Sequence, residues 1–97
     1  MKLNDFFSKL YVINLARRSD RYKEALKEFK KIDIEVERVE GIPGHNFKTP
    51  PMKPGAYGLL LTHIQLLKRA IEEKLDNFII FEDDVRFIDE FNNDKVI

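Results

Sequence analysis

Cysteine is absent from this 97-residue sequence. Its absence excludes disulfide bonds, cysteine-based zinc sites and a thiol nucleophile within these residues, and it fits a reducing compartment. The length sets a second limit, because 97 residues make at most one small domain. Hydrophobic residues make up 43% of the chain and include eight phenylalanines, which is enough for a core. We therefore expect one small domain over residues 1–97.

An excess of charge and a long apolar segment are also missing. The 17 lysines and arginines balance the 17 acidic residues, so the formal net charge is zero. A nucleic-acid partner usually requires a basic excess, and we expect none here. No segment approaches the roughly 20 apolar residues that a membrane helix needs. The N-terminus also has the wrong order of charged and apolar residues for a secretory signal. We therefore expect a cytoplasmic protein without a membrane span.

Glycine is scarce, and none of the four glycines stands in the turn after the first apolar run, Leu10–Leu15. The turn is therefore neither a dinucleotide-binding turn nor a Walker loop. It carries Arg17, Arg18 and Arg21 instead. Guanidinium groups at the carboxyl end of a parallel strand can hold a phosphate, helped by the following helix N-terminus. The alternative is a charged first helical turn whose arginines are simply solvated.

Apolar periodicity predicts three strands and two helices. The expected strands are Leu10–Leu15, Ile34–Val39 and Phe78–Phe81, and the expected helices run from about Ser19 or Asp20, as a cap, to Ile32 and from about Ala56–Leu59 to Lys74. Residues 41–55 contain all four prolines and form a long loop, which makes them a functional candidate. Right-handed crossovers would make the strands parallel, with the first between the other two. The fold class is therefore α/β, a three-layer half-Rossmann arrangement in the order β-α-β-loop-α-β.

The segment Phe78–Asp84 joins four apolar residues directly to three carboxylates. A run that is apolar on both faces is typical of a central strand in a parallel sheet covered by helices. Acidic residues at its carboxyl end would lie in the crevice where open α/β sheets bind ligands.

These three carboxylates can be interpreted in two ways. Strand alternation would send Glu82 and Asp84 to one side and Asp83 to the other. Two carboxylates on one side can ligate Mg²⁺ or Mn²⁺ while the ion keeps waters and takes phosphate oxygens. The alternative is a solvated acidic turn after a core strand.

The second helix brings a further pair of candidates, Thr62 and His63, near the same crevice. His63 lies beside the apolar face of the helix, where a histidine can be a ligand or base, or a hydrogen-bonded core residue. His45, in the loop, has less support. Tyr57 could stack on a base or close the core.

Four segments of the chain, in order, resemble glycosyltransferase family 25. They are Tyr11–Arg21, Val39–Gly41, Gly58–Ile64 and Phe78–Val85. This family includes bacterial lipooligosaccharide galactosyltransferases and galactosyltransferases that act on collagen hydroxylysine. Thr62-His63 stands where the family usually has Ser-His, a departure that keeps the hydroxyl.

The resemblance implies a GT-A-like fold, of which this chain would be the N-terminal, nucleotide-sugar-binding half. It implies a UDP-sugar donor (UDP-galactose or a related UDP-hexose), Mn²⁺ or Mg²⁺, and a carbohydrate or hydroxylysine-type acceptor, as in lipopolysaccharide biosynthesis. Glu82 and Asp84 would be the metal ligands, with Asp84 the stronger candidate. The residues implied near the nucleotide sugar are Asn14, Arg17, Arg18, Arg21, Thr62, His63 and Asp83.

Length is the main departure from that family. A GT-A enzyme needs a second half that binds the acceptor and commonly supplies a carboxylate, so no catalytic base is named here. The alternative is a non-catalytic remnant or interaction module that retains the half-fold. A third interpretation, a receiver-type Mg²⁺ phosphotransfer domain, requires an acidic pair after the first strand, where this chain has Asn14 and arginines. So short a chain also leaves a sheet edge exposed beside the last strand, where we expect homo-oligomerisation or docking to another chain.

Overall fold

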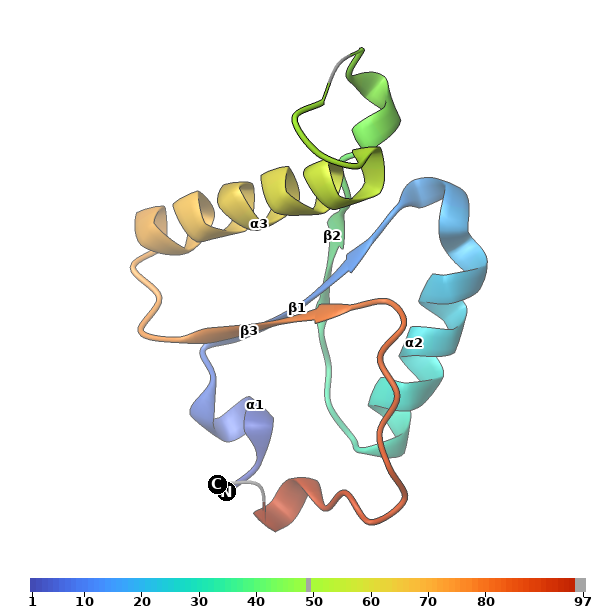
Figure 1. Ribbon diagram of the computed structural model, residues 1–97. Helices are drawn as coiled ribbons and strands as arrows, with labels where there is room; N and C mark the ends of the chain where they lie inside the picture. The colour runs from blue at the N-terminus through green and yellow to red at the C-terminus, as the bar shows by residue number, and fades with distance from the viewer. Residues whose placement is uncertain (49, 96–97) are drawn as a thin grey trace.

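Three short parallel strands form the centre of the structure, a computed structural model that describes residues 1–48 and 50–95. They are β1 (Lys9–Asn14), β2 (Glu37–Glu40) and β3 (Phe78–Glu82), in the sheet order β2-β1-β3 (Figure 1). At the carboxyl end of β1, Ile13 pairs with Val39 of β2 and with Glu82 of β3. The three strands therefore end at one edge of the sheet, as the sequence predicted.

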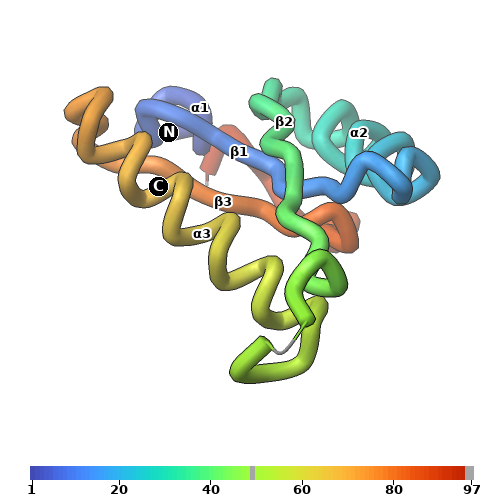
Figure 2. Tube along the Cα trace, turned by 90° about the horizontal axis from the view of Figure 1, so that it is seen from above, coloured from blue at the N-terminus to red at the C-terminus, as the bar shows by residue number. Residues whose placement is uncertain are grey.

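The two long helices cover opposite faces of this sheet. Helix α2 (Ser19–Lys31) and helix α3 (Pro54–Glu72) lie on either side of the strands in Figure 2. Successive side chains of a strand point to opposite faces. Accordingly, Leu10 and Val12 of β1 pack in the core cluster under α2, while Tyr11 and Ile13 pack in the cluster that includes Leu66 of α3. The predicted three-layer α/β arrangement is confirmed.

The core under α2 is built largely from aromatic rings. Phe29 is 2% exposed, and its ring centroid lies 5.1 Å from that of Phe81 and 6.0 Å from that of Phe87. The backbone N–H of Phe87 donates a 2.8 Å hydrogen bond to Glu28 Oε1. This hydrogen bond, reinforced by Lys31, lowers the pKa of Glu28. The segment after β3 is thus held against α2.

Several boundaries differ from the sequence prediction. The second strand covers Glu37–Glu40 instead of Ile34–Val39, because Asp33 has a positive φ of 58° and Ile34 then enters the core before pairing begins. Helix α3 begins at Pro54, earlier than predicted, with proline in its first turn, where the missing N–H costs nothing.

The start of α2 and the two ends of the chain contain turns and a short helix that periodicity did not predict. Neither Ser19 nor Asp20 caps α2, which follows directly on a 3-10 turn, Ala16–Arg18, without a side-chain cap. A short helix α1 (Leu3–Phe6) precedes β1, and a 3-10 turn lies at Asn93–Lys95. The buried Asn93 accepts from Leu3 N at 2.9 Å and donates to Ile32 O at 3.0 Å, so it ties both ends to α2.

The position of β3 confirms the predicted strand order but corrects the interpretation of its apolar run. Its run, apolar on both faces, indicated a central strand, yet β3 lies at one edge with β1 as its one neighbour in the described sheet. The discrepancy arises because periodicity reports how the two faces are covered and carries no information about the number of neighbouring strands. Within the described chain, no helix combines the length and apolar character needed to cross a membrane.

The aromatic core gives the first prediction. Replacing Phe29 by Ala removes a buried ring that two other rings contact, so we expect a loss of about 3–5 kcal/mol in the free energy of unfolding. Urea denaturation followed by circular dichroism measures it. Leu26→Ala, on the same helix at 41% exposure, is the matched control, and we expect a loss below about 1 kcal/mol. Equal losses for both variants would contradict this description of the core.

Candidate functional site

A cavity of about 390 Å³ opens where the three strands end. Each strand contributes a wall residue at or just after its carboxyl end: Ile13 from β1, Gly41 after β2 and Glu82 from β3. Its charged lining is formed by Arg17, Arg18, Arg21, Glu82 and Asp83. The arginines after β1 and the carboxylates after β3, which are far apart in sequence, therefore share one cavity, at the place where open α/β sheets bind ligands.

Asn14 is the centre of the hydrogen bonding beside this cavity. It is 2% exposed. Its Nδ2 donates to Asp83 Oδ2 at 2.8 Å and to the Arg18 carbonyl at 3.0 Å. Its Oδ1 accepts from Arg38 Nε at 3.1 Å. Both amide hydrogens and the carbonyl oxygen are thus engaged within the protein, and Asn14 does not line the cavity, so its role is to position other residues.

The acidic residues after β3 do not follow the predicted alternation. The strand ends at Glu82, and Asp83 and Asp84 occupy a turn, so Glu82 and Asp83 line the cavity together. Asp83 has a side chain 12% exposed, with its Oδ1 3.1 Å from Arg21 Nε and its Oδ2 bonded to Asn14. Asp84 is 70% exposed and reaches Arg21 Nη2 at 3.8 Å.

Arg38, on the edge strand β2, is a residue that sequence reasoning missed. Its Nε and Nη2 donate to the Oδ1 and backbone O of Asn14, and its Nη1 donates to Glu40 Oε2 at 3.0 Å. The guanidinium carbon also lies 5.6 Å from the centre of the Tyr22 ring. Arg38 thereby fixes the orientation of the Asn14 amide. The sequence predicted a strand over Ile34–Val39 but gave no sign that its Arg38 contacts Asn14 of β1.

The three arginines after β1 have different surroundings. Arg18 Nε and Nη2 each bond an oxygen of Asp20 at 3.0 Å, and this hydrogen bonding lowers the pKa of Asp20 to about 2. Arg21 bonds Asp83. Arg17 is exposed at the cavity, and among the described residues it has no carboxylate partner. Of the three arginines at the cavity, Arg17 is therefore the one whose charge has no carboxylate partner in residues 1–48 and 50–95.

The wall opposite the arginines is the loop between β2 and α3. Thr62 is fully buried: its hydroxyl donates to the Gly58 carbonyl at 2.8 Å and accepts from Ile42 N at 3.0 Å. A Cβ on Gly58 would overlap the Ile42 carbonyl and lie 2.7 Å from Gly44 N. Thr62 therefore lines the cavity but uses its hydroxyl to hold the loop on α3.

The remaining candidates lie around this wall. His63 is half-buried and does not line the cavity, whereas the exposed His45, in a 3-10 turn at Gly44–Asn46, does. The Tyr57 ring lies 5.1 Å from that of Phe47, edge to face, and so closes the loop on the helix. The predicted functional role of residues 41–55 stays a prediction, although six of them besides Gly41 line the cavity.

The carboxylates at the cavity suit a particular kind of metal site. No group of three His, Cys, Asp or Glu side chains that could hold an ion occurs in the described part of the chain. Both oxygens of Asp83 are already engaged by Arg21 and Asn14. This leaves the exposed Glu82, which lines the cavity, and the exposed Asp84, which follows it in the turn and is not among the lining residues. Two hard oxygen donors fit Mg²⁺ or Mn²⁺ that keeps waters and takes its other ligands from a diphosphate. They do not fit an ion enclosed by protein ligands.

The Asn14 network gives the second prediction. Asn14→Leu keeps the approximate shape but leaves Asp83 Oδ2, the Arg18 carbonyl and Arg38 without their partner, so we expect a loss of about 1–3 kcal/mol in the free energy of unfolding. Chemical denaturation measures the loss. Asn46→Leu, at an exposed position, controls for the change of residue type and should leave stability nearly unchanged. A neutral Asn14→Leu variant would show that the network has no energetic role.

The contact between the loop and α3 gives the third prediction. Gly58→Ala forces a Cβ into the loop backbone and should cost about 1–3 kcal/mol. Gly55→Ala is a matched control on the same helix, since a Cβ there meets nothing within 4 Å; it should be neutral or stabilising by up to about 1 kcal/mol. Thermal unfolding of the two variants measures the difference. The prediction is wrong if Gly58→Ala is as stable as Gly55→Ala.

Comparison with known proteins gives a consistent result. The family model described as glycosyltransferase family 25 (LPS biosynthesis protein) matches residues 7–95. Procollagen galactosyltransferase 2 of Mus musculus is 30% identical over 105 residues, which cover 88% of this chain and 17% of that protein. The procollagen lysyl hydroxylase and glycosyltransferase of Acanthamoeba polyphaga mimivirus is 34% identical over 113 residues, with 87% and 13% covered.

A further relative carries a different description. Inactive glycosyltransferase 25 family member 3 of Mus musculus is 26% identical over 105 residues, which cover 88% of this chain and 18% of that protein. The chain thus spans less than a fifth of the length of each of these relatives. The family model, in contrast, covers the sheet, both long helices and every residue that lines the cavity. The chain belongs to glycosyltransferase family 25.

Proposed function

We propose that the cavity at the carboxyl ends of β1 and β3 binds the diphosphate of a UDP-hexose donor, most simply UDP-galactose. The observation that carries this proposal is the convergence of three arginines and two carboxylates on one cavity at the ends of parallel strands. Family membership supports a sugar donor. The procollagen galactosyltransferases among the relatives support galactose as the sugar.

Arg17 is the primary phosphate-binding residue in this proposal. Its guanidinium lines the cavity without a carboxylate partner in the described chain, so it gains a charge-assisted bond without breaking an existing one. Arg18 and Arg21 are held by Asp20 and Asp83, and they present a positive potential from fixed positions. Fixed charges of this kind bind an anion with little reorganisation.

The carboxylates after β3 supply the second half of the proposal. Asp84 and Glu82 would hold a Mn²⁺ or Mg²⁺ ion, which would neutralise negative charge on the leaving UDP diphosphate as a Lewis acid. Asp83 holds Arg21 and Asn14 in place and leaves metal binding to its two neighbours. The acceptor would be a carbohydrate or hydroxylysine-type hydroxyl. The residues that line the cavity do not indicate where it would bind.

A second candidate function is donor binding without transfer. One observation favours it: a relative that matches the same share of the chain, 88%, is described as inactive. Both candidate functions predict that UDP binds. Only the transferase predicts that UDP-galactose is consumed. Release of UDP from UDP-galactose, measured with and without acceptor sugars, separates them.

Calorimetry with UDP in the presence of MnCl₂ gives the fourth prediction. We expect saturable binding that Arg17→Ala weakens roughly 10- to 100-fold, because one charge-assisted phosphate contact is worth about 1.5–3 kcal/mol. Asp84→Ala should remove the dependence on Mn²⁺. Arg86→Ala is the matched control, since Arg86 is exposed and does not line the cavity, and it should bind like the unmodified chain. The absence of any heat with UDP and Mn²⁺ would contradict the proposal.

A further inference from the structure

The guanidinium group of Arg38 begins a chain of hydrogen bonds that ends in the cavity. Its Nε donates to Asn14 Oδ1 at 3.1 Å. On the other side of the amide, Asn14 Nδ2 donates to Asp83 Oδ2 at 2.8 Å, and Asp83 Oδ1 lies 3.1 Å from Arg21 Nε. Asp83 and Arg21 line the cavity, whereas Arg38 and Asn14 are not among its lining residues. Arg38 therefore acts on the cavity through the residues that it bonds.

The orientation of the Asn14 amide is set by the groups at its two ends. A guanidinium carries only donors, whereas a carboxylate and a carbonyl carry only acceptors. A half-turn of the amide would place Nδ2 against Arg38 and Oδ1 against Asp83. Because Asn14 is 2% exposed, such a turn would leave buried polar atoms unbonded. The positive charge at one end and the negative charge at the other polarise the amide in the same direction, so each hydrogen bond strengthens the other.

A second branch of the same network reaches the turn that carries Arg17. Asn14 Nδ2 also donates to the Arg18 carbonyl at 3.0 Å. The Arg18 N–H in turn donates to the Leu15 carbonyl at 2.9 Å and closes the 3-10 turn Ala16–Arg18. Arg17 is the middle residue of this turn, so the place of its backbone depends on the same buried amide.

Arg38 is itself held on three sides. Its Nη1 donates to Glu40 Oε2 at 3.0 Å, and its Nη2 donates to the Asn14 carbonyl at 3.2 Å. Its guanidinium carbon lies 5.6 Å from the centre of the Tyr22 ring of α2. The donors of a guanidinium lie in one rigid plane, so these contacts fix the direction of the Nε–H that meets the amide.

We propose that Arg38 is a positioning residue: through Asn14 it sets the places of the charged groups of the cavity, and thereby the affinity of the cavity for a diphosphate. The positioning depends on hydrogen bonds within the chain alone, whereas the effect on affinity rests on the proposed function. Charges held in place bind an anion with less reorganisation than mobile charges do. Without Arg38, the Asn14 Oδ1 is buried without a donor, and the side chain relieves this cost by turning toward water and away from Asp83.

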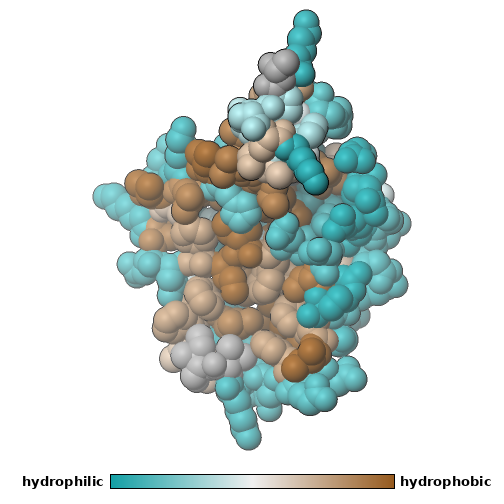
Figure 3. All heavy atoms as spheres, in the orientation of Figure 1, coloured by the Kyte–Doolittle hydropathy of each residue, from teal (hydrophilic) through white to brown (hydrophobic). Residues whose placement is uncertain are grey.

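The hydrogen bonds of Arg38 have more influence on the cavity than its charge. The surface over α2 is hydrophilic, as the right-hand side of Figure 3 shows, and it carries paired charges such as Lys27 and Glu24. Charges that face water are screened over about 8 Å at physiological ionic strength. The loss of one positive charge is therefore weakly felt at a distance, and a control that loses an arginine elsewhere separates the two effects.

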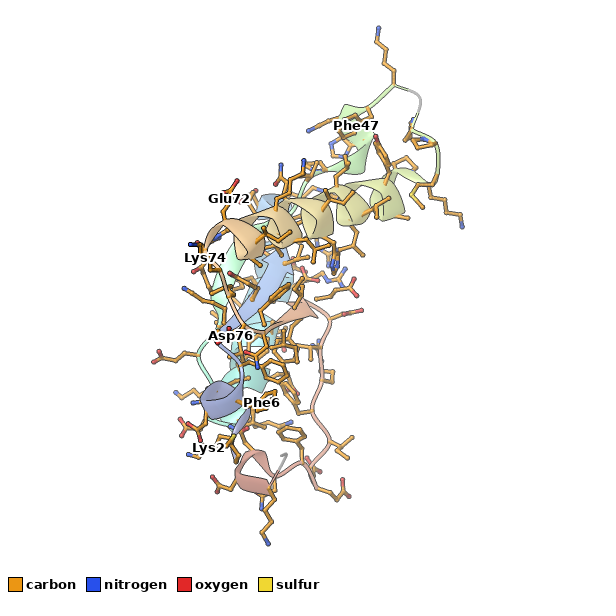
Figure 4. The ribbon with its side chains drawn as sticks, turned by 90° about the vertical axis from the view of Figure 1, so that its left-hand side faces the viewer. Lys2, Phe6, Phe47, Glu72, Lys74 and Asp76 are labelled. Carbon is orange, nitrogen blue, oxygen red and sulfur yellow. The ribbon has the colours of Figure 1, made fainter. Side chains whose placement is uncertain are left out.

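Arg69 provides this matched control. Like Arg38, it bonds a glutamate of β2 and has its guanidinium carbon near the centre of a tyrosine ring, at 5.4 Å. It stands in the last turn of α3 and is not among the residues that line the cavity. Figure 4 shows Glu72 at this end of α3, and Phe47, in the loop that forms one wall of the cavity, beyond the other end.

Heteronuclear NMR of the ligand-free full chain tests the positioning directly. The signals to follow are those of the Asn14 side-chain amide and of Arg21 Nε–H. In Arg38→Met, which keeps an unbranched stem but removes the donors, we expect both signals to shift and their hydrogens to exchange faster with water. Arg38→Lys, which can supply one donor, should give smaller changes, and it carries the same test if Arg38→Met does not fold. Arg69→Met should leave both signals in place.

Calorimetry with UDP and MnCl₂ tests the effect on affinity. We expect Arg38→Met to bind UDP roughly 3- to 30-fold more weakly, the range for a residue that acts on a ligand through others. Arg38→Lys should recover part of the loss, and Arg69→Met should bind like the unmodified chain. UDP binding that is unchanged in Arg38→Met, or equally weakened in Arg69→Met, would overturn the proposal.

The two measurements separate this proposal from the proposed function. If the unmodified chain binds no UDP, the proposed function fails, and the NMR signals of the free chain still decide whether Arg38 positions the cavity. Asn14 and Arg21 signals that do not change in the Arg38 variants, or that change equally in Arg69→Met, overturn the positioning role whether or not UDP binds.

Discussion

The buried side-chain amide of Asn14 is the interaction on which the rest of the site depends. Burying an amide is costly unless each of its polar atoms is bonded. Asn14 meets this requirement with partners from β2, from the turn after β1 and from the turn after β3. One side chain thereby joins the carboxyl ends of all three strands. A misplacement of any of these segments would leave a buried polar atom unpaired.

The same hydrogen bonding explains how a chain without net charge can place several charged side chains close together at the cavity. Asn14 fixes one oxygen of Asp83, Arg21 takes the other, and Asp20 holds Arg18. Opposite charges are thus paired inside the protein before any ligand arrives. Arg17, exposed at the cavity, is the arginine that this pairing does not use. In the proposed site, selectivity for an anion would come from one arginine without a carboxylate partner among fixed ion pairs, and would require no overall basic charge.

Periodicity predicted the elements well because the core of this protein is organised by it. The apolar runs located β1, β3 and both long helices within a few residues, since each has a face that must be buried. The sides taken by Asp83 and Asp84 were wrong because alternation stops where β3 ends, at Glu82. Arg38 was missed for a related reason. Its contact with Asn14 crosses from one strand to another, and no local pattern encodes which side chain of an edge strand reaches its neighbour.

Hydrogen bonding distinguishes the cavity from the outer side of β3. The cavity is finished within the chain: its strands end together, its buried amide is fully bonded and its loop is fastened to α3 by Thr62. The outer side of β3, in contrast, has no strand beside it among the described residues. The cavity and the strand side use different parts of β3, since the end of a strand presents side chains and its side presents backbone hydrogen-bonding groups.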